Sequence, residues 1–220
     1  MQRIPEPELM DDPIQAAAYA AADFTEPHNM FVEKFRKIFP EVEVTGKVLD
    51  LGCGPADVSI RFARAYPQCR IDGVDGAKAM LQEGTRRLKR ENLAGRICLF
   101  HGLIPDIAVP EKHYSVIISN SLLHHLHDPA VLWQCIKNYS HDHTIIYVMD
   151  LMRPQTTQVA NVLVNTYSGS EPMILKQGFY NSLCAAFTPG EVQGQLNTAG
   201  LGQLQIKAIS DRHMLVYGQC

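Results

Sequence analysis

The chain has 220 residues, of which 46% are hydrophobic and 20% are charged, and its formal net charge is −3 at pH 7. This length suits one domain with a small insertion, and the composition is that of a globular protein rather than a disordered one. The negative balance provides no basic surface for nucleic acid, so we expect no nucleic-acid partner. No apolar run of about 18 residues occurs, so we also expect no membrane span.

The first residues contain no positively charged segment leading into an apolar run, so we predict no signal peptide. The six cysteines are scattered along the chain, and none forms a CxxC pair. Such spacing favours free thiols in a reducing compartment over disulfides or a zinc knuckle. We therefore expect a cytoplasmic protein, and the sequence leaves a homodimer open.

Two helices are predicted ahead of the first strand. The alanine-rich run from Ile14 to Phe24 favours a helix. Large apolar residues between Phe31 and Phe39 recur at helical spacing, and Pro40 ends that pattern. We interpret residues 1–45 as an N-terminal helical arm or lid.

From residue 46 onward, short apolar runs alternate with helical patterns. Strands are predicted at 47–51, 70–74, 96–100, 114–119 and 144–149, and helices follow the first, second and fourth of them. Near-continuous apolar strands that alternate with helices predict a mostly parallel sheet covered on both faces.

The alternation breaks at about 152–187, which we interpret as a helical insertion in a domain that spans 46–220. A capping box at Thr188 and Glu191 starts the next helix, and Gly200 follows its last turn. Two short strands at about 203–208 and 213–218 have too short a link for a helical crossover, so they are antiparallel. The expected fold is a doubly wound α/β sheet of seven strands with a C-terminal antiparallel hairpin.

The clearest local signal is the segment Val48–Ala56 (VLDLGCGPA), where a strand passes through a glycine turn into a helix. Gly52 and Gly54 permit positive φ and let a ligand approach the backbone. The helix N-terminus offers free N–H groups at the sheet edge where parallel α/β folds bind ligands. A nicotinamide dinucleotide site is disfavoured, because Asp57 stands where its third glycine belongs.

An acidic residue, Asp75, ends the second predicted strand. A carboxylate at this place can accept hydrogen bonds from a ribose diol. It can also cap the helix that starts at Ala77, and the two roles are compatible.

Three segments in this order and spacing resemble the first, second and fourth motifs of class I S-adenosylmethionine (SAM)-dependent methyltransferases. They are Leu49–Gly54 (LDLGCG), Gly73–Asp75 (GVD) and Ser119–His125 (SNSLLHH). The resemblance is close over roughly 46–150 and loose in the hairpin, and it implies a Rossmann-like methyltransferase fold with SAM as cofactor. Taken with the residue patterns, it implies cofactor contacts from Tyr19, Asp50, Gly52, Cys53, Gly54, Asp75, Gly76, Met80, Leu103 and Asn120.

The chain departs from the family pattern at two positions. Ala56 replaces a glycine, a small change for a tight turn. The acid that often contacts adenine after the third strand is absent, and Leu103 or His101 is expected to pack there instead.

The histidines of the segment His124–Asp128 are candidate catalytic groups. Either His124 or His125 could take a proton from an oxygen or nitrogen acceptor, because imidazole titrates near neutrality. Adjacent histidines diverge in regular structure and no second ligand cluster is evident, so we expect no metal. His124, Arg153 and Tyr180 are the predicted substrate contacts.

The function expected from these features is methyl transfer from SAM to the oxygen, nitrogen or carbon of a small molecule, EC 2.1.1.-. Methyl transfer needs little covalent help from a protein, because the positioning of the reactants supplies much of the acceleration. The alternative from another class is a non-catalytic SAM-binding or regulatory protein.

Overall fold

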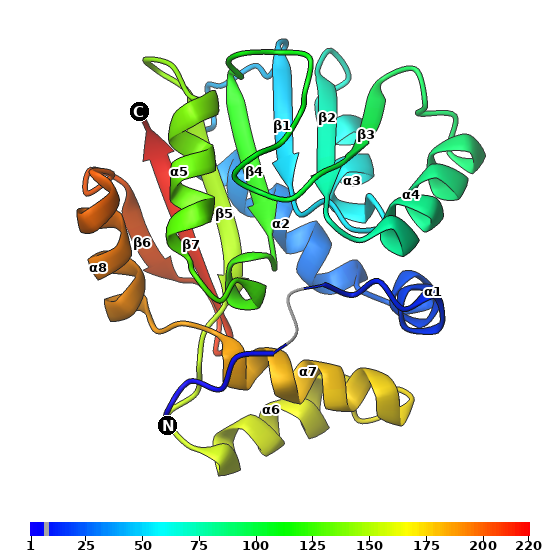
Figure 1. Cartoon of the computed structure of the whole chain (residues 1–220), viewed down its shortest axis with the longest axis vertical. Helices are drawn as coiled ribbons and strands as arrows, with labels where there is room; N and C mark the ends of the chain where they lie inside the picture. Colours follow the sequence, from blue (N-terminus) through cyan, green and yellow to red (C-terminus); the bar gives the residue numbers. More distant parts are fainter. Residues whose placement is uncertain (7–8) are drawn as a thin grey trace.

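Strands with apolar residues on both faces build a seven-stranded sheet at the centre of the molecule (Figure 1). The computed structural model describes residues 1–6 and 9–220. The strands are β1 (Lys47–Leu51), β2 (Arg70–Asp75), β3 (Ile97–His101), β4 (Val116–Asn120), β5 (Ile145–Leu151), β6 (Gln205–Ala208) and β7 (His213–Gln219). Their order is β3-β2-β1-β4-β5-β7-β6. The first five are parallel, and β7 runs antiparallel to both β5 and β6, which confirms the predicted fold.

Helices cover both faces of this sheet. They are α1 (Pro13–Ala21), α2 (Thr25–Ile38), α3 (Asp57–Ala65), α4 (Lys78–Arg90), α5 (Ala130–Tyr139), α6 (Thr157–Ser168), α7 (Met173–Ala185) and α8 (Pro189–Ala199), with a 3-10 turn, η1 (Leu123–His125). Successive strand residues point to opposite faces. Val48 therefore packs in the core with α2 and α3, whereas Leu49 packs in the core with α5 and α8.

Helix α2 is fixed to the sheet by aromatic residues. Phe31 and Phe35 are fully buried, and both rings meet Tyr147 of β5 edge-on. The Tyr147 hydroxyl donates to the carbonyl of Phe31 at 2.9 Å. These phenylalanines are core residues, as their helical spacing predicted.

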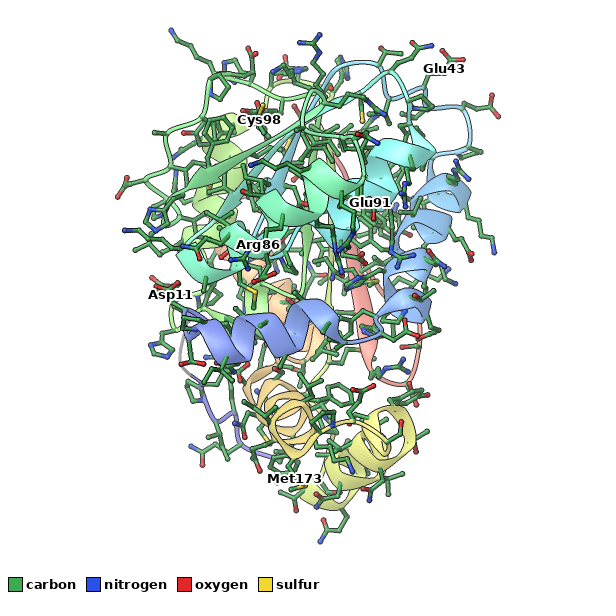
Figure 2. All side chains as sticks on the ribbon, turned by 90° about the vertical axis from the view of Figure 1, so that its right-hand side faces the viewer. Asp11, Glu43, Arg86, Glu91, Cys98 and Met173 are labelled. Atoms are coloured by element: carbon green, nitrogen blue, oxygen red, sulfur yellow. The ribbon has the colours of Figure 1, made fainter. Side chains whose placement is uncertain are left out.

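Three helices gather where the parallel strands end. Figure 1 shows α1, α6 and α7 at this end of the sheet, below the arrowheads of β1 and β4. In Figure 2, α1 crosses the molecule between α4 and α7, with Asp11 near its start and Met173 at the outer end of α7. Contacts of α1 with both α4 and α7 agree with this view. Among the described residues, no helix has the length and apolar character needed to cross a bilayer.

Two local features differ from the sequence-based expectation. Helix α1 ends at Ala21 rather than at Phe24, which instead stacks against Tyr19 with ring centroids 4.6 Å apart. The turn η1 was not predicted, because three residues are too few for a periodic pattern. It holds both candidate histidines.

Candidate active site

The glycine turn after β1 has the left-handed backbone that its residues predicted. Gly52 has φ +73° and Gly54 has φ +50°. A side chain at Gly52 would also strike Leu122, which lies 2.9 Å from the place of its Cβ. The backbone N–H groups of Gly52 and Cys53 donate to the carbonyl of Val74 at 2.8 and 3.0 Å, which ties the turn to β2. Ala56 is left-handed too, at φ +63°, so the turn tolerates the missing glycine.

Asp75 joins the ends of β1 and β2. Its two carboxylate oxygens accept from Gly54 N and Ala77 N, each at 2.8 Å. Burial raises the pKa of Asp75, while these two donors oppose that change. A carboxylate has about four acceptor sites, so two stay open for further donors. The capping role therefore exists and leaves room for the expected ribose contact.

A cavity of about 270 Å³ lies over these ends of the strands. Its lining includes all ten residues expected to contact the cofactor: Tyr19, Asp50, Gly52, Cys53, Gly54, Asp75, Gly76, Met80, Leu103 and Asn120. Three further arm residues, Leu9, Met10 and His28, line the same cavity and were not foreseen. The arm therefore forms one wall.

One part of the cavity is narrow and apolar. The position of a Cβ at Gly76 lies 2.6 Å from a methyl group of Leu103 and 2.8 Å from one of Leu9, so a larger residue here would displace both leucine side chains. Leu103 is 58% exposed, and His101 Nε2 lies 3.1 Å from the carbonyl of Gly76. The exposed Leu103 side chain thus gives this part of the cavity an apolar surface, at the place where the family's adenine contact is missing.

Asn120, at the end of β4, carries the polar atom that best indicates a ligand. Its side-chain Oδ1 is buried and has no hydrogen-bond partner among the described residues. A buried acceptor without a partner costs roughly 1–3 kcal/mol, so such groups usually meet a donor in the functional state. An amide oxygen can accept from an ammonium, the group at the methionine end of SAM. The residues present fit the implied cofactor.

Burial raises the pKa values of two groups in the cavity. Burial raises the pKa of Asp50 to about 7, although Ser59 Oγ donates to its carboxyl at 2.5 Å. Burial also raises the pKa of Cys53 well above its ordinary value. The Cys53 thiol is therefore a packing group here rather than a nucleophile.

Asp57 connects the arm to the methyltransferase-like part of the chain. His28 of α2 contacts it at 2.6 Å, and Arg61 and Arg87 donate to it at 2.8 Å. Burial would raise the pKa of Asp57, but these partners outweigh it and hold the pKa well below the usual range. Arg87 also donates to the carbonyl of Ala20 in α1. In the sequence, Asp57 was notable only for standing at the place of a glycine, because its partners His28 and Arg87 lie 29 and 30 residues away and leave no local pattern.

The histidine pair does not diverge, contrary to the sequence-based argument. The rings of His124 and His125 have centroids 4.3 Å apart and a tilt of 34°. Both turn toward the carboxylate of Glu6, whose Oε1 lies 3.6 Å from His124 Nε2 and 3.4 Å from His125 Nδ1. Glu6 was not foreseen, because the N-terminal residues meet η1 only in the folded chain.

The two histidines differ in their surroundings. His124 is buried, and its Nδ1 lies 2.6 Å from Asp150 Oδ1. Burial would lower the pKa of His124, but the Asp150 carboxylate outweighs it and raises that pKa. His125 lines the cavity, whereas His124 is not among its lining residues.

The other predicted substrate contacts also lie away from the cavity lining. Arg153 donates to Ala186 O at 3.1 Å and to Glu191 Oε1 at 2.6 Å, which fastens α8 to the end of β5. Tyr180 packs against a small cluster between α6 and α7. Their contact with a substrate stays a prediction.

Comparison with known proteins assigns the central part of the chain. Residues 48–140 match the family model described as a methyltransferase domain. This central part of the chain is therefore similar to a methyltransferase domain. An uncharacterized methyltransferase of Schizosaccharomyces pombe is 27% identical over 94 residues, which is 40% of this chain and 34% of the relative. A trans-aconitate 2-methyltransferase of Methylobacterium radiotolerans is 31% identical over 93 residues, 41% of this chain and 32% of the relative. The methyltransferase domain thus matches about a third of the length of each of these relatives.

Solved structures share the fold of this chain over more than nine-tenths of its length. A SAM-dependent methyltransferase from Aquifex aeolicus has a TM-score of 0.68 and 15% identity, covering 94% of this chain and 97% of its own. A SAM-dependent methyltransferase from Geobacter sulfurreducens, solved with S-adenosylhomocysteine, has a TM-score of 0.59 and 17% identity, covering 91% and 74%. At this identity the likeness establishes the fold alone.

Proposed function

We propose that the chain transfers a methyl group from SAM to a small-molecule acceptor. The observation that carries the proposal is the single cavity that joins the glycine turn, Asp75 and the unpartnered buried carbonyl of Asn120. The Gly54 turn and Asp75 would hold the ribose, the apolar surface at Gly76 and Leu103 would contact the adenine, and Asn120 would accept from the amino group.

The protein's contribution in this proposal is positioning. When bound, SAM supplies a methyl group on a sulfonium, so transfer makes one bond to the acceptor, breaks the S–CH₃ bond and leaves S-adenosylhomocysteine. Holding both reactants in line can lower such a barrier by about 7–11 kcal/mol in favourable cases. His125 lines the cavity and would contact the acceptor, while His124, fixed by Asp150, would act as a positioning residue.

A small acceptor agrees with the charge of the chain and with its enclosed cavity. The net charge of −3 provides no basic surface, and α1 and α7 lie at the end of the sheet where the cavity opens. Among the relatives, the names of the trans-aconitate and demethylmenaquinone methyltransferases give small acceptors, whereas a Pedobacter heparinus enzyme is named for a tRNA. We favour the small acceptor because nucleic-acid binding requires lysine and arginine at the phosphates.

Three further expectations belong to this proposal. Residues 1–45 would act as the arm or lid, and residues 152–187, which hold α6 and α7, as the insertion that shapes the acceptor end. The protein would work in the cytoplasm, where its free cysteines stay reduced.

Titration calorimetry with SAM, S-adenosylhomocysteine and NAD tests the cofactor. We expect SAM and its product to bind and NAD not to bind. Asp75→Ala should weaken SAM binding roughly 10- to 150-fold, because hydrogen bonds to a charged group contribute about 1.5–3 kcal/mol. Asp142→Ala, which removes an exposed carboxylate from a turn, is the matched control and should bind SAM as the parent does.

Two results would count against the proposal in different ways. If SAM does not bind, or binds equally well to Asp75→Ala, the cofactor site is misplaced. If SAM binds but a broad panel of metabolites yields no S-adenosylhomocysteine, the non-catalytic SAM-binding alternative is favoured.

A further inference from the structure

We propose that Glu6, His124 and His125 form a binding site for a divalent transition-metal ion, with Zn²⁺ as the ion that suits these ligands best. One ligand atom from each residue lies within 4.8 Å of the other two. Imidazole nitrogen and carboxylate oxygen are the usual ligands of Zn²⁺ other than thiolate. The site rests on these three residues and does not depend on the proposed methyl transfer.

The distances suit an ion better than direct contact. Glu6 Oε1 lies 3.6 Å from His124 Nε2 and 3.4 Å from His125 Nδ1, and Glu6 Oε1 has no hydrogen-bond partner among the described residues. With metal–ligand distances of about 2.0–2.2 Å, two ligands of a tetrahedral ion stand about 3.4 Å apart. The Glu6 oxygen is therefore spaced from each ring nitrogen as two ligands of one small ion are, and all three ligand atoms lie within 4.8 Å of one another.

The hydrogen bond of His124 with Asp150 leaves the lone pair of Nε2 facing the proposed ion. Its Nδ1 lies 2.6 Å from Asp150 Oδ1, so the ring donates there and Nε2 is the acceptor in the neutral form. A histidine that ligates a metal commonly donates its other N–H to a carboxylate in this way. Asp150 also accepts from Leu123 N at 2.7 Å and Leu151 N at 2.6 Å, which fixes the carboxylate behind the ring.

Burial and charge are compatible with a cation at this place. The side chains of Glu6, His124 and His125 are 11%, 3% and 15% exposed, so the ligands are shielded but His125 reaches the cavity. The Glu6 and Asp150 carboxylates offset a divalent charge. The nearby Arg3 guanidinium donates instead to the carbonyls of Ala185, His124 and Leu126.

An ion bound here would link the arm to the rest of the chain. Glu6 precedes the arm residues that wall the cavity, and η1 follows β4, so one ion would join segments more than 115 residues apart. Ligation through Nδ1 would also occupy His125, which the proposed function places against the acceptor. We therefore expect Zn²⁺ to bind in the absence of SAM and to slow methyl transfer.

Calorimetric titration of the full chain with zinc chloride, together with anomalous diffraction at the zinc edge, tests the site. We expect one ion per chain, with an anomalous peak between Glu6 and the histidine pair. Glu6→Gln keeps the shape of the side chain but is a poor ligand. Loss of a hydrogen-bond partner behind a ligand typically weakens metal binding roughly 10–100-fold. Loss of a direct ligand, as in Glu6→Gln, should weaken Zn²⁺ binding at least as much. His124→Asn should weaken Zn²⁺ binding in the same way. If the buried His124→Asn variant does not fold, the Glu6→Gln variant is sufficient to test the site.

A second histidine pair supplies the control. His113 and His141 are exposed, with ring centroids 6.2 Å apart, and could bind zinc adventitiously. Changing both to asparagine should leave the binding unchanged. The proposal is overturned if the parent takes up no zinc, if Glu6→Gln binds it as tightly, or if the anomalous peak lies at His113 and His141. If the protein takes up no zinc but binds SAM normally, the zinc site is overturned and the proposed function is left intact.

Discussion

At the scale of single residues, the burial of Asp50 makes the stability of the folded chain depend on pH. Its pKa is about 7 in the folded chain because of burial, against an ordinary value of 3.8. The folded state therefore holds the proton more tightly than the unfolded state. The stability that this proton contributes is present at low pH and is lost as the pH rises between these two values.

Asp50→Asn should remove this dependence. The amide oxygen can still accept from Ser59, and it needs no proton to stay neutral. Relative to the parent, the variant should gain stability between pH 4 and pH 8 by up to about 4 kcal/mol, at 1.36 kcal/mol for each unit of pKa. Urea unfolding at several pH values measures the difference, with Asp142→Asn as the exposed control. If the difference in unfolding free energy between variant and parent stays constant with pH, Asp50 is not a buried carboxyl with a raised pKa.

At the scale of elements, Arg3 holds the first residues of the arm in place. It donates to Ala185 O at 2.6 Å and to Leu126 O at 2.8 Å, and it stacks 4.0 Å over the Phe187 ring. These bonds tie the first residues to η1 and to the end of α7. The Asp57 cluster anchors the other end of the arm.

Arg3→Ala should therefore loosen the arm and weaken SAM binding. Each lost bond from a charged donor is worth about 1.5–3 kcal/mol, so amide exchange in α1 should become at least roughly tenfold faster. SAM should dissociate faster, because Leu9 and Met10 wall the cavity. Hydrogen exchange and stopped-flow binding measure the two effects. Lys37→Ala, an exposed change on α2, is the control; unchanged exchange in α1 would contradict the anchoring role.

At the scale of the whole molecule, the C-terminal hairpin completes both the sheet and its core. Met214, Leu215 and Val216 of β7 are almost fully buried, and β7 covers the edge of β5 along its full length. Burying such side chains contributes about 1.5–3 kcal/mol each, so three approach the total stability of a typical domain.

A chain truncated after Gly200 should consequently fail to fold. It would leave β5 as an open apolar edge, which promotes aggregation. Circular dichroism and size-exclusion chromatography measure the outcome, and the full chain is the reference. A monomeric truncated chain with a cooperative thermal transition would show that the hairpin is dispensable.

Much of the fold and of the cofactor cavity could be predicted from local patterns. Apolar runs mark the strands, and Thr188 with Glu191 makes the capping box that the sequence indicated. Gly52 and Asp75 were identifiable because strand ends of a parallel sheet meet at one edge. The turn η1 is too short for a periodic pattern. The contacts of Asp57 with His28 and Arg87, and of Glu6 with the histidine pair, could not be predicted because these partners are distant in sequence.

By itself, the sequence determined the seven strands and their winding, since periodicity and turn chemistry act over a few neighbouring residues. The resemblance of its motifs to those of SAM-dependent methyltransferases implied ten of the residues that line the cavity. Only the tertiary structure decided that Leu9 and Met10 wall this cavity and that Arg153 clamps α8. It also decided that Glu6 meets His124 and His125. The reason is physical: such contacts depend on how the arm and the insertion pack on a finished sheet, and no local pattern records that packing.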